Sequence, residues 1–95
     1  MNQHESRRVA MQAVYLANEE PDYSAAEVET KIVITLDLKE LSAYSKILIE
    51  GVLAKRDELK KDLGSHLKKG WQLDRVNKIA VAIMEVALYE IKYTS

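Results

Sequence analysis

Residues 79–89 read IAVAIMEVALY, a stretch that is apolar at every position except Glu85. Six consecutive apolar residues, Ile79 to Met84, cover every direction around an α-helix, because each residue advances the helix by about 100°. A helix of this kind is buried on all sides rather than along one stripe. The sequence therefore predicts a last helix that needs more cover than the preceding helices provide, either from further helices beyond Ser95 or from self-association.

The remainder of the chain has the composition of an all-α protein. It contains one proline and three glycines, and its apolar residues recur at spacings of three and four, which is the period of a helix that faces a core. Helices are predicted over about 3–18, 25–36, 38–63 and 77–93, with a short turn or helix at 71–76. We expect about five helices in a bundle, with a three-helix subdomain over 1–64 and the start of a second, truncated helical subdomain over 65–95.

Three predicted helix starts carry a capping side chain followed three residues later by a glutamate. They are Asn2 with Glu5, Ser24 with Glu27, and Asp37 with Glu40. Each pair can bond N–H groups that the first helical turn leaves unpaired. Only the Ser24 pair fits the strict capping-box pattern.

Two glycines in the third predicted helix have different expected roles. Gly51 lies in its interior and is expected to permit the close approach of another helix, with a neutral, tolerated glycine as the alternative. Gly64 is expected to end the helix in a left-handed conformation. The apolar stripe of this predicted helix consists of Leu41, Tyr44, Leu48, Val52, Leu59 and Leu63.

Composition excludes several classes of function. The chain has no cysteine, which removes disulfides, thiolate nucleophiles and thiolate metal sites together. We predict no metal site, because His66 has no second histidine at ligand spacing, and no cofactor. We also predict no enzyme activity, because the chain lacks a glycine-rich phosphate loop and a nucleophile with a histidine partner. The charged N-terminus and the lack of an uncharged stretch of roughly 18 residues predict a cytoplasmic protein.

Charge is balanced over the whole chain but not along the first predicted helix. The 14 lysines and arginines against 15 acids give a net charge of −1, so nucleic-acid binding would require a local basic patch. On a helical wheel His4, Arg8, Gln12 and Tyr15 share one arc. The opposite arc is apolar and consists of Val9, Ala10, Ala13, Val14, Leu16 and Ala17. The polar arc is a candidate RNA-contacting surface, and the alternative is an ordinary solvated helix start.

A second basic stretch, residues 46–78, is predicted to be mainly a salt-bridged solvent-facing surface, with secondary phosphate contacts as the alternative.

Two groups of residues together resemble one known family. The segment HESRRVAMQAVY at residues 4–15 is similar to the first helix of the NusB family. A second group matches the family's spacing of a long third helix, a tryptophan turn and a fifth helix, and comprises Tyr44, Gly51-Val52, Leu59, Leu63, Leu67, Trp71-x-Leu73-x-Arg75 and Ala87-Leu88-Tyr89-Glu90-Ile91. The resemblance covers the chain except for residues 19 to about 35 and predicts a NusB-like bundle that lacks the family's last two helices.

The resemblance implies a transcription antitermination factor that binds a boxA-like element of ribosomal RNA together with a ribosomal small-subunit protein, NusE. Carried over by position, the RNA-binding residues are His4, Arg7, Arg8, Gln12 and Tyr15. Single-stranded RNA is held by cations on its phosphates and by stacking of its bases on flat side chains, which arginine and tyrosine supply. Many family members carry an acid and arginines in the fifth helix where this chain has Ala80, Val81 and Glu85, so we expect weak RNA binding by this chain alone.

Two other functions remain open from the sequence. One is a NusB-like RNA-binding domain of a ribosomal RNA methyltransferase. The other is a purely structural helical oligomerisation module that forms a homodimer through its last helix.

Three further residues are expected to have packing roles. For Trp71, packing between helices is favoured over stacking on a base. Tyr89 and Glu90 are expected to pack at the end of the last helix.

Overall fold

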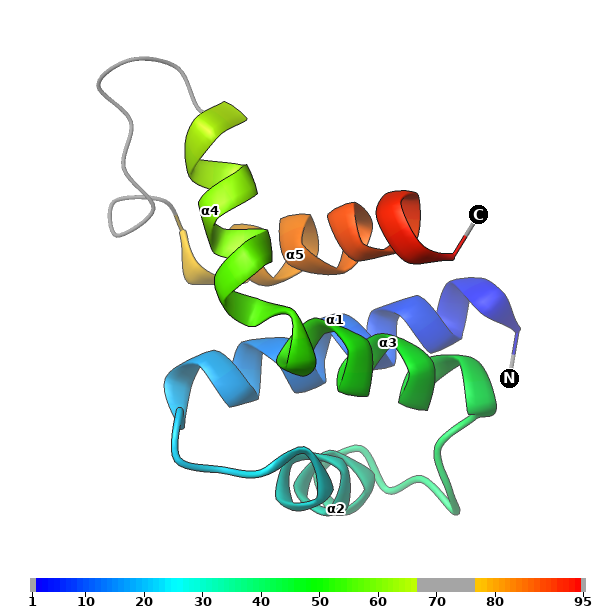
Figure 1. Cartoon of the computed structure of the whole chain (residues 1–95). Helices are drawn as coiled ribbons and strands as arrows, with labels where there is room; N and C mark the ends of the chain where they lie inside the picture. Colours follow the sequence, from blue (N-terminus) through cyan, green and yellow to red (C-terminus); the bar gives the residue numbers. More distant parts are fainter. Residues whose placement is uncertain (1, 67–76, 95) are drawn as a thin grey trace.

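The computed structural model describes residues 2–66 and 77–94, and over these ranges its regular secondary structure is all α-helix, with no strand. The helices are α1 (Gln3–Glu19), α2 (Ala25–Thr35), α3 (Ala43–Ala54), α4 (Arg56–His66) and α5 (Lys78–Tyr93). Figure 1 shows α1 in the middle of the bundle, with α3 alongside it, α2 on one side and α5 on the other. The all-α prediction is confirmed.

α1 is the central helix because its small apolar side chains let three neighbours approach it. It contacts α2, α3 and α5. The side chain of Asn2 caps its start by accepting a 2.8 Å hydrogen bond from the backbone N–H of Glu5, as predicted. Of the residues in the predicted apolar arc, only Leu16 is partly buried. The others are buried, and they are Val9, Ala10, Ala13, Val14 and Ala17.

α2 begins with the predicted capping box. The Ser24 hydroxyl accepts from the N–H of Glu27 at 3.1 Å, and the Glu27 carboxylate accepts from the N–H of Ser24 at 3.0 Å. The helix buries Val28 and Ile32, which are one helical turn apart, against the core. The four-residue spacing of Val28 and Ile32 therefore puts both on the face of α2 that packs against the core.

The prediction of one long helix from Leu38 to about Leu63 is wrong. The chain forms two helices there, α3 and α4, separated by a turn at Lys55. Leucines from both helices are buried, namely Leu48 in α3 and Leu59 and Leu63 in α4. The apolar spacing therefore continues across the turn and does not reveal it.

The predicted start and end of that helix are also wrong, for local reasons. Asp37 does not cap it, because Asp37 takes a left-handed conformation with φ 54°. The cap is Ser42, whose hydroxyl accepts from the N–H of Ser45 at 3.1 Å. Gly64 does not stop α4, which continues to His66.

α5 begins where the sequence indicates and is covered on one side. The side chain of Asn77 caps it by accepting from the N–H groups of Ile79 and Ala80. The helix packs against α1, α3 and α4. Its buried residues are Val81, Ala82, Glu85 and Val86. Three isoleucines face outward, with exposed fractions of 56% for Ile79, 43% for Ile83 and 76% for Ile91. The expectation of an incompletely covered last helix therefore agrees with the structure.

Trp71 and the predicted turn or helix at 71–76 lie outside the described residues. The predicted division into subdomains at residue 64 stays a prediction.

Candidate nucleic-acid interface

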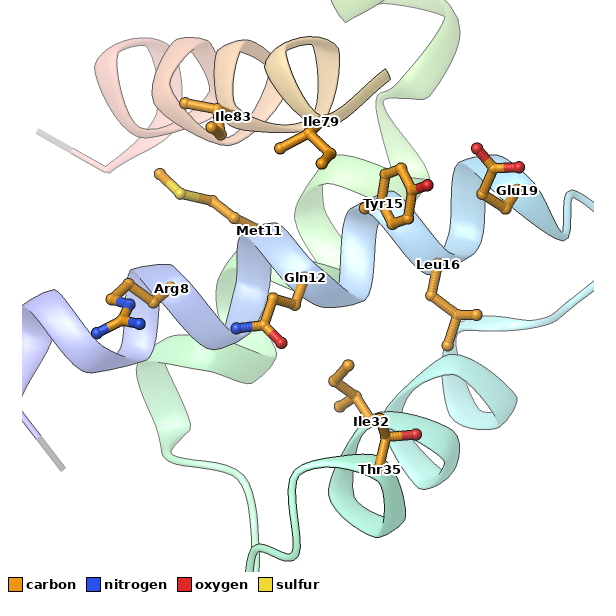
Figure 2. Close-up of a pocket in the computed structure, with 10 residues that line it drawn as sticks. All are labelled: Arg8, Met11, Gln12, Tyr15, Leu16, Glu19, Ile32, Thr35, Ile79 and Ile83. Carbon is orange, nitrogen blue, oxygen red and sulfur yellow. The ribbon is translucent and has the colours of Figure 1, made fainter. Parts of the chain in front are cut away.

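Three of the five predicted RNA-binding residues line one groove. Arg8, Gln12 and Tyr15 project from the same face of α1, and Figure 2 shows them along the groove floor. The groove has a volume of about 540 Å³. Its other lining residues are Met11, Leu16 and Glu19 from α1, Ile32 and Thr35 from α2, and Ile79 and Ile83 from α5.

The groove is an apolar trough with charge at its ends. Figure 2 places Arg8 at one end of the labelled α1 residues and Glu19 at the other. Arg8 and Gln12 are exposed and Tyr15 is half-buried. The Tyr15 ring and the exposed Arg8 guanidinium, about two helical turns apart, offer a stacking surface and a phosphate partner on one helical face. The arrangement can hold an extended or helical ligand that is partly apolar.

The other two predicted residues do not line this groove. His4 is exposed in the first turn of α1. Arg7 is half-buried and its Nε donates a 2.6 Å hydrogen bond to Oε2 of Glu90 in α5. The resemblance put Arg7 and Arg8 in one RNA-binding set, whereas the structure pairs Arg7 with Glu90 and leaves Arg8 along the groove.

Arg7 belongs to a polar cluster that joins three helices. Glu90 Oε2 accepts from Arg7 in α1 and also from the Tyr44 hydroxyl in α3. The hydrogen bond and the charge of Glu90 raise the pKa of the Arg7 guanidinium. Only 14% of the Glu90 side chain is exposed, so both donors satisfy a carboxylate that is largely removed from water. Arg7 therefore has a structural role that the sequence did not reveal.

A second contact joins α3 and α5 where the sequence predicted a close approach. A Cβ added to Gly51 would lie 2.1 Å from Cζ and from the hydroxyl oxygen of Tyr89. A Cβ therefore fits at position 51 only if the Tyr89 ring shifts. Gly51 therefore allows the Tyr89 ring to lie against α3, and this contact favours the close-approach role over that of a neutral, tolerated glycine.

Glu85 occupies an interior position. Its side chain is fully buried, and Oε1 accepts a 2.7 Å hydrogen bond from Nδ2 of Asn18 in α1. Burial raises the pKa of the Glu85 carboxyl, and the Asn18 hydrogen bond and the charges of Lys60 and Arg56 oppose that rise. Among the described residues, neither the second Glu85 oxygen nor the Asn18 carbonyl oxygen has a hydrogen-bond partner. Position 85 therefore faces the core in this chain and is not part of an exposed binding surface.

The described residues contain no group of three or more His, Cys, Asp or Glu side chains that could hold a metal ion. Within the same residues, no helix has the length and apolar content that crossing a membrane requires.

Comparison with known proteins identifies the family. The sequence profile of the NusB family matches residues 4–95. The transcription antitermination protein NusB of Lacticaseibacillus casei is 39% identical over 94 residues, which cover 97% of this chain and 67% of that protein. The protein of the same name from Ligilactobacillus salivarius is 26% identical over 94 residues, covering 99% of this chain and 72% of that protein. No solved structure matches significantly. The chain therefore belongs to the NusB family, as the segment at residues 4–15 and the order and spacing of the matching residues from Tyr44 to Ile91 indicated.

Proposed function

We propose that this chain acts in transcription antitermination by binding RNA through the exposed face of α1. The proposal rests on family membership and on one structural observation, the gathering of Arg8, Gln12 and Tyr15 along a single groove. The relatives described above are named as antitermination proteins. Those names favour this function over that of a domain belonging to a ribosomal RNA methyltransferase.

Each groove residue offers a different contact to single-stranded RNA. The Arg8 guanidinium can pair with a phosphate, the Tyr15 ring can stack on a base, and the Gln12 amide can hydrogen-bond a base edge. His4 lies one turn before Arg8 and extends the same exposed surface toward the N-terminus of α1. Arg7 contributes through the part of its guanidinium that Glu90 leaves unbonded, since 41% of its side chain is exposed.

The RNA and the protein partner follow from the resemblance to the family. We propose a boxA-like ribosomal RNA element as the RNA, and the ribosomal small-subunit protein NusE as a partner that binds together with it. The proposed reaction is association only, and no bond in the RNA is made or broken.

The second candidate function is a structural oligomerisation module. It is favoured by the exposed isoleucines of α5, Ile79, Ile83 and Ile91, which are the kind of surface that a homodimer buries. It differs from the first function in needing no RNA. RNA binding therefore discriminates between the two.

The test is a titration of the chain with a fluorescent boxA-like RNA and with a scrambled RNA of equal length, at several salt concentrations. Binding through phosphates should weaken steeply as salt rises, and loss of one phosphate contact in Arg8→Ala should reduce the salt slope by about 0.7. Lys39→Ala is the matched control, because Lys39 is an exposed cation in the segment between α2 and α3 and does not line the groove. Absence of binding at low salt, or equal binding by wild type and Arg8→Ala, would contradict the proposal.

A further inference from the structure

Three side chains from different helices meet at one end of the bundle. Arg7 belongs to α1, Tyr44 to the first turn of α3 and Glu90 to the last turn of α5. Figure 1 shows the N-terminus of α1 and the C-terminal end of α5 on the same side of the bundle. Glu90 Oε2 accepts hydrogen bonds from Arg7 Nε at 2.6 Å and from the Tyr44 hydroxyl. The Tyr44 hydroxyl therefore holds the carboxylate in place, and the carboxylate holds the guanidinium.

This cluster is covered at its centre and open at its edge. Only 14% of the Glu90 side chain is exposed, whereas 41% of the Arg7 side chain is exposed. A recess of about 310 Å³ opens beside the cluster. A guanidinium carries several N–H donors in one fixed plane, and the bond to Glu90 occupies the donor at Nε. Donors at the Nη nitrogens therefore remain for a group that arrives from solvent.

We propose that Glu90, held by Tyr44, is a positioning residue that points the free edge of Arg7 toward an RNA phosphate. This role rests on the proposed function, in which Arg7 belongs to the RNA-binding surface. Arginine binds phosphate best through two parallel N–H groups, so the direction of its plane decides whether both bonds form. Glu90 itself is largely covered by protein and acts through Arg7.

Arg7 lies at the edge of the surface that carries Arg8. His4 precedes Arg7 by three residues and Arg8 by four, so it neighbours both on the outside of α1. A single strand that crosses the first two turns of α1 can therefore bring phosphates to both arginines. Among the described residues no ion pair involves Arg8. Arg7 is thus the oriented phosphate contact, and Arg8 is the less restrained one.

Prior orientation of Arg7 raises affinity because it removes a cost of binding. An arginine side chain loses rotamer freedom when a phosphate fixes it, and this loss lowers affinity about two- to tenfold. Glu90 imposes much of that order before RNA arrives. The carboxylate also has an opposing effect, since its negative charge lies beside the cation and repels RNA. The sign of the effect of removing Glu90 therefore separates positioning from simple charge.

The test is a double-mutant cycle between Arg7 and Glu90, measured by titration of the full chain with the fluorescent boxA-like RNA. Glu90→Leu removes the acceptor and its charge, and should weaken RNA binding about two- to tenfold when Arg7 is present. In an Arg7→Ala background the same change should not weaken binding, because the group that Glu90 orients is absent. Weaker binding in both backgrounds would overturn the proposal, since Glu90 would then only support the fold. Tighter binding by Glu90→Leu would also overturn it, because charge removal alone has that effect.

A milder variant keeps every charge at neutral pH. Tyr44→Phe removes the hydroxyl that holds Glu90, and should weaken RNA binding by a smaller factor, again only when Arg7 is present. Tyr23→Phe is the matched control and should bind RNA like wild type, because Tyr23 lies between α1 and α2 and lines neither the groove nor the recess. Helical circular dichroism shows which variants fold, and Tyr44→Phe provides the test if Glu90→Leu does not fold. Equal RNA binding by Tyr44→Phe and Tyr23→Phe would overturn the proposal.

Lysine substitutions separate an oriented cation from a less restrained one. Arg8→Lys keeps the charge at a site where no ion pair fixes the side chain, and should bind RNA within about twofold of wild type. Arg7→Lys keeps the charge but loses the planar fork, so it should lose nearly as much affinity as Arg7→Ala. Equal losses from the two lysine substitutions would contradict the positioning role.

The outcome at Arg8 distinguishes a failure of this proposal from a failure of the proposed function. If Arg8→Ala weakens RNA binding but Arg7 and Glu90 show no coupling, only the positioning role is wrong. If neither arginine affects RNA binding, or if RNA does not bind, the proposed function is wrong and the positioning role with it.

Discussion

Replacing Gly51 with alanine should destabilise the fold, although the same change usually stabilises a helix. A Cβ at position 51 would lie 2.1 Å from the ring of Tyr89, and an ordinary carbon contact needs about 3.5 Å. The ring would have to move by about 1.4 Å, the difference between these distances. It cannot move freely, because it is half-buried and its centroid lies 5.1 Å from that of Tyr93.

The expected size of the effect is the balance of two terms. Overpacking of this kind costs about 1–3 kcal/mol, and alanine in place of glycine inside a helix returns about 1 kcal/mol. We therefore expect Gly51→Ala to lower the free energy of unfolding by about 1 kcal/mol, measured by urea denaturation followed by helical circular dichroism. In a Tyr89→Ala background the obstruction is absent, and the same glycine substitution should raise the free energy of unfolding by up to about 1 kcal/mol.

The chain provides its own control for this prediction. Gly64 also lies within a helix, but nothing lies within 4 Å of a Cβ added there. Gly64→Ala should therefore stabilise the protein by a few tenths to about 1 kcal/mol. The reasoning is refuted if Gly51→Ala stabilises as much as Gly64→Ala, or if its effect has the same sign with and without the Tyr89 ring.

Substitutions at three carboxylates of the bundle provide further tests. Glu90→Gln removes the charge that Arg7 pairs with, so urea unfolding should show a lower stability, and adding Arg7→Ala to Glu90→Gln should then cost less than Arg7→Ala alone. Burial raises the pKa of Glu85, so its folded state binds a proton more tightly than its unfolded state, and wild-type stability should fall as pH rises above the ordinary glutamate range. Glu85→Gln should therefore stabilise the chain by about 1–2 kcal/mol at neutral pH and flatten that fall, as measured by urea unfolding at several pH values. Partial burial and the neighbouring Glu50 raise the pKa of Glu29 to about 7, so this group contributes a loss of stability between about pH 4.5 and pH 7, and Glu29→Gln should remove it; an unchanged pH profile would contradict this assignment.

Much of the fold could be predicted because local chemistry determines it. The Asn2 and Ser24 caps begin helices where they were expected, since a side-chain oxygen before a helix bonds N–H groups only a few residues away. The close approach at Gly51 could also be predicted, because a glycine inside a helix is unfavourable unless packing requires it.

What could not be predicted depends on contacts distant in sequence or on geometry that apolar spacing does not encode. The turn at Lys55 separates two helices whose leucines continue one stripe, so periodicity cannot detect it. Ser42 and Asp37 are both acceptable caps in sequence, and only the conformation of Asp37 decides between them.

The site could be predicted in part. The helical wheel correctly placed Arg8, Gln12 and Tyr15 on one face, and their binding of RNA stays a prediction. It could not show that Arg7 pairs with Glu90, because the two residues are 83 positions apart. Nor could it show that Glu85 points inward toward Asn18.

That separation of 83 positions also bears on how the protein acquires its structure during synthesis. α1 leaves the ribosome first, yet one of the helices that cover it, α5, leaves after α2, α3 and α4. The small apolar side chains of α1 must therefore stay partly uncovered, or be shielded by a chaperone, until α5 has emerged and can dock. Late docking of α5, more than the formation of any single helix, should then set the rate at which the native bundle appears.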